Sequence, residues 1–297
     1  MALSPGHVAL RTILYVIPRS IRAYLYSRIA SYYARGWRPN GITSPTISFL
    51  PFKLVLKRIE GDNSNEIAAL RLASRLQGIN TPTLLDHAWS TTSTYILMNH
   101  IDGQDCGAVW DDLTPPDMAR ISAELRQQLE SMHRQTAGGC DRICNVAGAP
   151  IKDPRVSWLE DDPRLFATPL EFYEQVWLGL DKPQLASTLR PLIRPVMERP
   201  DVPIVFYQED LQPKNVLLPG GLAGWRSGTA AVCILDWEFA AWAPRPWEAL
   251  KATWLVMDRE GPDADPWFEM MEHVFPECID EMEADWLWRC KSGITLV

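Results

Sequence analysis

The first 59 residues contain neither aspartate nor glutamate, although they hold nine arginine and lysine residues. The chain as a whole is acidic, with a formal net charge of −8 over 297 residues. Acidic proteins are poor general binders of nucleic acid, so we expect no nucleic-acid partner. The basic segment can meet phosphates, an anionic membrane surface or the acidic remainder of the chain, and we favour the last of these.

Long apolar runs are also missing. The early run over residues 8–17 is interrupted by Arg11, ends before Pro18 and falls short of the roughly 20 residues that span a bilayer. We therefore expect no integral membrane segment and no secretory signal. An arginine-rich, acid-free N-terminus resembles a mitochondrial transit peptide, but apolar and aromatic residues continue through Tyr33 and Trp37. We favour a helix that packs on the body of the protein.

Cysteine pairs with the C-x-x-C spacing are absent, and the six cysteines are dispersed along the chain. Cys140 and Cys144 lie close in sequence but have no histidine spaced for zinc, so we expect reduced thiols and a cytoplasmic location. The apolar share of 46% and the charged share of 22% exclude a disordered chain, a collagen-like chain and a disulfide scaffold.

Apolar periodicity divides the chain into a β-containing front and a mainly helical remainder. Helical patterns cover residues 8–35 and 63–78, and strand patterns cover residues 46–59 and 94–98. The chain is long for one compact domain. We therefore expect a small and a large lobe that meet at a cleft, with the boundary in the polar segment 99–104.

The expected large lobe holds the clearest helix and a small group of strands. Thr114 can cap a helix whose apolar residues recur at steps of three and four. Strands are expected over residues 204–207, 215–218 and 230–235, with a turn at 219–224 between the last two. Helical patterns follow to the C-terminus.

Three polar side chains in this group of strands have the spacing that phosphoryl transfer requires. Asp210 follows the first strand, Asn215 lies five residues later, and Asp236 follows the third strand. A carboxylate can orient an attacking hydroxyl and accept its proton, while an amide oxygen and a second carboxylate can bind Mg²⁺ beside the phosphates. Asp and Asn are also favoured in ordinary loops, but the position of Asp236 argues against that simpler interpretation.

A lysine and a glutamate in the front part form a candidate phosphate-binding pair. Lys57 lies near the end of a predicted strand, and Glu66 opens the helix that follows. Such a pair holds the α- and β-phosphates in kinase-like lobes, although a surface lysine and a first-turn glutamate would also explain both residues. Alternation places Lys53 and Lys57 on the same strand face, so periodicity does not choose between them.

Seven stretches carry a likeness to a known family: LPFKLVLK (50–57), SNEIAAL (64–70), GINTPTLLDHAW (78–89), YILMNHIDG (95–103), CNVAGAPIKDPR (144–155), YQEDLQPKNVLL (207–218) and ILDWEFAAWAPRPWE (234–248). Together they resemble the aminoglycoside phosphotransferase/choline kinase-like family, especially its fungal branch. The resemblance covers most of the chain and implies an α+β, bilobal, protein-kinase-like fold. A small β-rich N-lobe and a larger, mainly helical C-lobe are expected.

The resemblance also implies a division of the chain. We expect residues 1–41 to form a basic helical extension and residues 42–100 to form the nucleotide-binding N-lobe. Residues 101–297 would form the C-lobe with the catalytic loop, the metal site and the acceptor site. The expected cofactors are ATP and Mg²⁺, and the expected assembly is a monomer or a homodimer.

Residue roles follow from the same resemblance. Asp210 would be the catalytic base, and Asn215 and Asp236 would be the Mg²⁺ ligands. Lys57, rather than Lys53, would hold the phosphates, with Glu66 as its ion-pair partner. The backbone that would face adenine runs through Met98, Asn99, His100 and Ile101.

The chain departs from the family pattern at two places. The family usually has a histidine two residues before the catalytic aspartate, where this chain has Gln208. A glutamine amide can donate a hydrogen bond and so can brace the loop, although its extra rotamers can weaken the brace. No clear glycine-rich phosphate loop precedes Lys57.

We therefore expect an ATP- and Mg²⁺-dependent kinase that phosphorylates a hydroxyl of a small molecule. Eleven carboxylates over residues 258–285 would suit an amine-bearing acceptor, but a solvated acidic face explains them more simply. The alternatives are a pseudokinase that binds nucleotide or a partner, and an enzyme that uses ATP to activate a biosynthetic intermediate.

Overall fold

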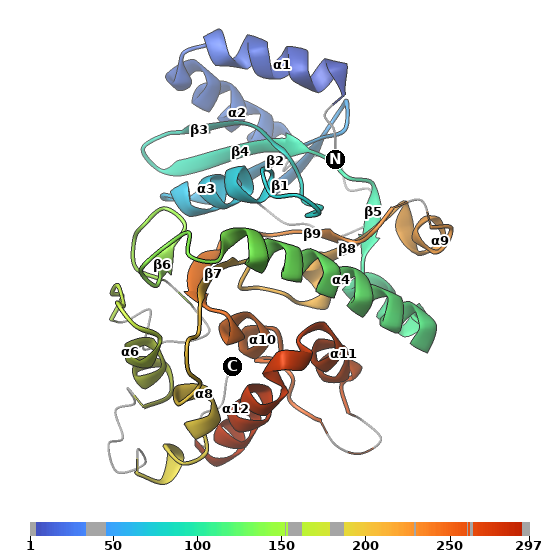
Figure 1. Cartoon of the computed structure of the whole chain (residues 1–297). Coiled ribbons are helices and arrows are strands. Elements are labelled where there is room, and N and C mark those ends of the chain that lie inside the picture. The colour runs from blue at the N-terminus through green and yellow to red at the C-terminus, as the bar shows by residue number, and fades with distance from the viewer. Residues whose placement is uncertain are drawn as a thin grey trace.

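The computed structural model describes residues 4–33, 46–151, 153, 162–178, 187–228, 230–259, 261 and 264–292. It has two lobes, a smaller one built on a four-stranded antiparallel sheet and a larger one that is mainly helical (Figure 1). The expected α+β, bilobal fold is confirmed. Within the described residues, no helix is both long and apolar enough to cross a membrane.

The sheet of the small lobe has the strand order β1-β2-β4-β3. Its strands are β1 (Ile47–Leu50), β2 (Leu54–Glu60), β3 (Leu84–Trp89) and β4 (Ser93–Asn99). Along a strand, successive side chains point to opposite faces. In β2, Val55 packs toward the large lobe, whereas Leu54 and Leu56 pack on the opposite face.

Helices α1 (Pro5–Val16) and α2 (Arg19–Tyr33) cover that opposite face, away from the large lobe (Figure 1). Leu14, Tyr26 and Ala30 are buried there against the sheet. The two helices confirm the helical pattern predicted from residue 8, with Pro18 between them; positions 34 and 35 lie outside the described residues.

Helix α3 (Ser64–Ala73) lies on the inner face of the sheet, between it and the large lobe (Figure 1). The side chain of Asn63 accepts a hydrogen bond from the Glu66 amide and so caps the helix. The predicted end at Gly78 is wrong by five residues, because the last amides bond three residues back and tighten the turn after Ala73.

The chain enters the large lobe through β5 (Gly103–Asp105), which pairs with β8 (Val216–Pro219) and not with the first sheet. β8 also pairs with β9 (Cys233–Ile234). A third sheet joins β6 (Cys144–Asn145), β10 (Ala241–Pro244) and β7 (Ile204–Tyr207) in that order. These short strands lie between the small lobe and the helices of the large lobe (Figure 1).

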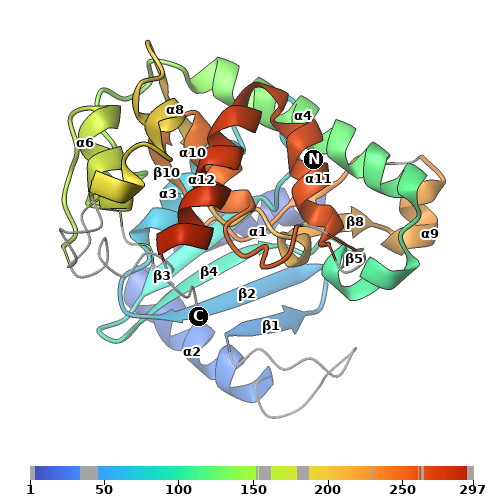
Figure 2. The same ribbon diagram turned by 90° about the horizontal axis from the view of Figure 1, so that it is seen from below.

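Helix α4 (Pro115–Thr136) is the longest helix and begins with a reciprocal cap between Thr114 and Asp117. The other helices that the structure describes after β6 are α6 (Pro169–Tyr173), a π-helical turn (Glu174–Leu178), α8 (Arg194–Met197), α9 (Gly221–Arg226), α10 (Pro246–Ala252), α11 (Pro266–Val274) and α12 (Ile279–Ser292). Short 3-10 turns cover Gly107–Asp112, Pro213–Asn215 and Pro276–Cys278. Seen from below, α11 and α12 lie over the rest of the large lobe (Figure 2).

Two predicted elements differ from the structure. Helix α9 begins at Gly221, inside the turn expected over 219–224, because Gly220 and Gly221 reverse the chain with positive φ values and Leu222 and Trp225 are then buried. The strand expected over 230–235 is reduced to Cys233–Ile234, since only its end pairs with β8.

Candidate active site

The loop from β7 to β8 carries Asp210 and Asn215. The Asn215 side-chain nitrogen Nδ2 donates to the Asp210 carboxylate at 2.9 Å and to its backbone carbonyl at 2.8 Å. Gln212 Nε2 donates to the other carboxylate oxygen at 2.5 Å. Both Asp210 and Asn215 are buried, so the carboxylate is held in one orientation by neutral amides. Lys214 lies 3.6 Å from Asp210 Oδ2 on the exposed side.

Asp236 comes beside this loop because β8 and β9 are neighbours. The Leu235 amide donates to the Asn215 carbonyl at 2.8 Å, which fixes the end of β9 against the start of β8. Asp236 itself has a φ of 54°, and Glu209 has a φ of 77°, in the left-handed region that non-glycine residues rarely adopt. Backbone of this kind persists only where its surroundings hold it in place.

Gln208 links the two segments. Its side-chain oxygen accepts from the Asp210 amide at 2.8 Å, and its Nε2 donates to the carbonyls of Leu235 and Asp236 at 2.9 and 2.6 Å. The side chain is fully buried. An amide can donate and accept at once, so one residue ties the Asp210 loop to the Asp236 turn.

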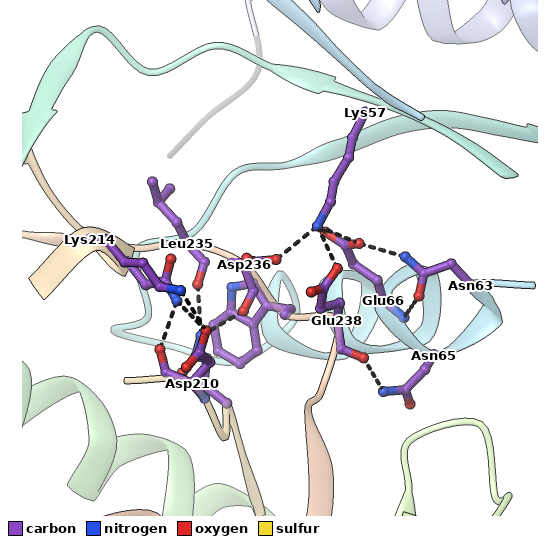
Figure 3. A network of polar contacts seen from close by, with 12 residues as sticks. Lys57, Asn63, Asn65, Glu66, Asp210, Lys214, Leu235, Asp236 and Glu238 are labelled. Carbon is purple, nitrogen blue, oxygen red and sulfur yellow. Dashed lines mark hydrogen bonds and ion pairs between the residues drawn. The ribbon is translucent and has the colours of Figure 1, made fainter. Parts of the chain in front are cut away.

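Lys57 extends from β2 of the small lobe and binds carboxylates from both lobes (Figure 3). Its Nζ atom lies 3.0 Å from the carboxylate of Glu66, 2.8 Å from Asp236 Oδ1 and 3.1 Å from Glu238 Oε2. Asn63 Nδ2 donates to Glu66 Oε2 at 2.7 Å and completes the network. Strand β2, helix α3 and the turn after β9 therefore meet at one ammonium group.

Burial and charge act in opposite directions on this cluster. Burial alone would lower the pKa of Lys57, but the carboxylates of Glu66, Asp236 and Glu238 outweigh it and raise the pKa above its usual value. Burial raises the pKa of Glu66 to about 7, although the Lys57 charge pulls it down. The lysine therefore stays protonated, while Glu66 can gain a proton near neutral pH.

Carboxylate oxygens of Glu66, Asp236 and Glu238 lie within 4.8 Å of one another. Hard oxygen donors of this kind suit Mg²⁺, which usually keeps one or two protein carboxylates and takes its remaining ligands from water and phosphates. Asp236 and Glu238 are partly exposed and Glu66 is buried. The donor set therefore fits a cation at Asp236 and Glu238. Glu238 lies in the motif quoted above, but its contact with Lys57 had no signal in the sequence.

Lys53 and Lys57, the two candidates for the phosphate-binding lysine, lie in different elements: Lys57 is in β2 and Lys53 is not. Lys53 lies in the turn between β1 and β2 with a φ of 55°, and its Nζ contacts Asp102 at the surface. The expectation from alternation was wrong because Lys53 is outside the strand, so the face of β2 does not apply to it.

Two backbone amides of the segment expected to face adenine already donate hydrogen bonds within the protein. The Asn99 amide donates to the Thr83 carbonyl at 3.2 Å, and the His100 amide donates to the Lys53 carbonyl at 2.8 Å. Met98 is buried in β4 between β2 and β3. For the Ile101 amide, the described part of the chain contains no such backbone bond.

Four arginines, two of them from distant segments, bind carboxylates of the acidic stretch that begins at residue 258. Arg199 contacts Glu281, Arg245 contacts Glu277 at 2.6 Å, and Arg289 contacts Asp285 at 3.0 Å. Arg259 contacts both Glu272 and Glu283. Glu260 and Asp263 lie outside the described residues. Five of the nine carboxylates that the structure describes in this stretch are therefore engaged in ion pairs within the protein, which weakens the sequence argument for an amine-bearing acceptor.

Comparison with solved structures identifies the same fold. The structure of aminoglycoside phosphotransferase APH(3'')-Id from Streptomyces rimosus in complex with ADP and streptomycin is 17% identical, with a TM-score of 0.52, over 90% of this chain and 97% of that one. A second structure of that enzyme gives 16% identity and a TM-score of 0.44 over 93% of each chain. No family model matches the sequence, and no curated protein matches it. The likeness supports an aminoglycoside phosphotransferase-like, kinase-like fold.

Proposed function

We propose that this protein is an ATP- and Mg²⁺-dependent phosphotransferase that acts on a hydroxyl group of a small molecule. One observation carries the proposal: Lys57 of the small lobe binds Glu66 of the same lobe and Asp236 of the large lobe, and Gln208 joins the Asp236 turn to the Asp210 loop by hydrogen bonds. A phosphate-binding lysine, a metal-binding carboxylate and a candidate base thus form one connected unit.

The residues divide the work by position. Asp210, oriented by Asn215 and Gln212, would accept the proton of the attacking hydroxyl. Asn215 and Asp236, with Glu238 beside them, would hold Mg²⁺, which neutralises charge on the phosphates when bound. Lys57 would exchange part of its contact with the carboxylates for the α- and β-phosphates, while Glu66 keeps its orientation.

Nucleotide would lie between the lobes. The solved relative named above was determined with ADP, and the position of the present β4–β5 connection is consistent with an adenine contact at the Ile101 backbone. The sequence has no clear glycine-rich loop before Lys57, but the β1–β2 turn has two left-handed residues, Phe52 and Lys53. We propose that this turn takes the place of the glycine-rich loop.

The pseudokinase alternative rests on one observation. Lys57 already neutralises Asp236 and Glu238, which a metal and phosphates would have to share. Use of ATP to activate a biosynthetic intermediate also fits the same site, and it differs from simple phosphorylation only in its product. The fungal branch of the family, a cytoplasmic location, the domain limits and the assembly remain predictions.

The test is release of ADP from Mg·ATP in the presence of a panel of hydroxyl-bearing metabolites and aminoglycosides, with mass analysis of the products. Wild-type protein should add one phosphate to an acceptor, and Asp210→Asn should lower kcat by about 10²- to 10⁴-fold. Asp141→Asn, at an aspartate whose side chain is 90% exposed and pairs with Arg142, is the matched control and should be fully active. Equal ADP release by wild type and Asp210→Asn would refute the proposal. A product that has lost water would favour the activation alternative.

A further inference from the structure

The exposed residues of α1 and α2 include many large apolar side chains and no acidic residue. Helices on a protein surface usually turn polar side chains outward. Here the inward side of α2 buries Ala23, Tyr26 and Ala30, and the outward side is also apolar. A large exposed apolar patch on a protein marks a site of interaction.

The outward side of α2 has a regular pattern. Ile21, Tyr24, Leu25, Arg28 and Tyr32 recur at helical spacing and are all exposed, with Tyr24 at 64% and Tyr32 at 75%. These residues form one stripe that faces away from the sheet. Its one positive charge, Arg28, lies three or four residues from Tyr24, Leu25 and Tyr32.

Helix α1 also carries exposed apolar side chains and an exposed arginine. Val8, Arg11 and Tyr15 recur at steps of three and four, and Tyr15 is 88% exposed. Among the described residues, neither Arg11 nor Arg28 forms an ion pair. Arg22, by contrast, is bound by Asp86 beneath the helices, and Arg19 stacks on the Trp89 ring at 4.1 Å. The chain's own acids therefore neutralise the inner arginine and leave the two outer ones.

We propose that the exposed residues Val8, Arg11 and Tyr15 of α1 and Ile21, Tyr24, Leu25, Arg28 and Tyr32 of α2, here called the α1–α2 surface, dock together on an anionic lipid bilayer. Tyrosine suits the boundary between headgroups and acyl chains, because its ring is apolar and its hydroxyl is polar. Arginine is attracted to anionic headgroups, and no aspartate or glutamate of these two helices opposes it. The helices are too short to span a bilayer and would lie flat on it.

A second copy of the chain is a poorer occupant of this surface. A two-fold contact between identical surfaces would bring Arg11 and Arg28 of both copies together with no acid to balance them. The lipid headgroup layer supplies the missing negative charge.

Docking would leave the candidate active site uncovered. Helices α1 and α2 lie on the outer side of the small-lobe sheet, whereas Lys57 extends from the other face of that sheet to Asp236 of the large lobe (Figures 1 and 3). The proposal therefore does not depend on the proposed phosphotransferase activity.

The experiment measures sedimentation of the full chain with vesicles of phosphatidylcholine alone and of phosphatidylcholine and phosphatidylserine in equal amounts. Binding should occur only to the anionic vesicles and should weaken as salt is added. The double variant Arg11→Glu/Arg28→Glu should bind at least about twentyfold more weakly, since each arginine near an anionic surface contributes about fivefold. Tyr24→Ser/Tyr32→Ser should also weaken binding, because it removes apolar area without changing charge.

Two exposed positions elsewhere give matched controls. Arg75→Glu reverses an exposed arginine just after α3, and Met257→Ser removes an exposed apolar side chain from the large lobe; both should bind like wild type. Circular dichroism establishes that each variant is folded. Absence of wild-type binding to anionic vesicles, or equal loss in Arg75→Glu, would overturn the proposal. So would a wild-type dimer in light scattering that Tyr24→Ser/Tyr32→Ser dissociates, because a second copy would then be the occupant.

Discussion

The side-chain amide of Gln208 donates a hydrogen bond to the backbone carbonyl of Asp236 at 2.6 Å. The same side chain accepts from the Asp210 amide, so the candidate base and the candidate metal ligand are held relative to each other by one buried glutamine. The family that the sequence resembles usually has a histidine at this position, and Gln208 also supplies a hydrogen-bond donor there.

Removing this donor should weaken both the fold and the reaction. Gln208→Leu leaves the carbonyls of Leu235 and Asp236 buried without a donor, which costs about 1–3 kcal/mol in the free energy of unfolding. We expect kcat to fall and the KM for ATP to rise, because the Asp236 turn loses its anchor. Gln208→His should retain more of the free energy of unfolding and more of kcat than Gln208→Leu, because an imidazole can donate a hydrogen bond. Chemical denaturation and steady-state kinetics measure the two effects, and equal stability of the leucine variant and wild type would contradict the role given to Gln208.

Replacing Lys57 and Lys53 in turn should lower the free energy of unfolding by different amounts. Lys57→Met leaves Glu66, Asp236 and Glu238 without their shared cation and should cost about 3 kcal/mol in the free energy of unfolding, since one of these carboxylates is buried. Lys53→Met removes only a surface pair, whose side chains are 70% and 57% exposed, and should cost less than about 1 kcal/mol. Urea unfolding of both variants provides the comparison. Similar losses in the two would contradict the buried network.

The raised pKa of Glu66 should make the free energy of unfolding fall as the pH rises from about 4.5 to 7. Its pKa is about 7 in the folded protein and 4.5 when unperturbed, so between these values the folded state holds a proton that the unfolded state has lost. This contribution is fully present below pH 4.5 and is lost as the pH rises through 7, with a slope of at most about 1.4 kcal/mol per pH unit. Glu66→Gln should flatten the fall in stability over this range.

The control for this prediction is Glu130→Gln, which changes a glutamate at the surface of α4. Its free energy of unfolding should follow the same pH curve as that of the wild type. If Glu66→Gln retains the full wild-type slope between pH 5 and 7, the raised pKa of Glu66 is not its source.

Local features that depend on residue type and spacing could be predicted from the sequence. The cap at Thr114, the break at Pro18 and the order of Asp210, Asn215 and Asp236 could all be recognised from residue types and spacing. Their roles in catalysis remain predictions that the structure makes specific.

Features that depend on distant contacts could not be predicted in the same way. Strand β10 has four residues and ends in proline, so it has little strand character until β7 and β6 pair with it. Residues 258–285 contain one arginine, Arg259, and no lysine. Arg199 and Arg245, which pair with carboxylates of this stretch, lie elsewhere in the sequence, so these ion pairs could not be predicted from it. The contact of Glu238 with Lys57 likewise joins residues 181 positions apart.

Binding of ATP with and without Mg²⁺, measured by calorimetry on the full chain, tests the proposed site most directly. Wild-type protein should bind ATP more tightly with Mg²⁺, and Asp236→Asn should lose this gain while Asp141→Asn keeps it. No detectable binding of ATP to the wild type, or an identical gain from Mg²⁺ in wild type and Asp236→Asn, would contradict a phosphoryl-transfer site built on Asp236, Lys57 and Asp210.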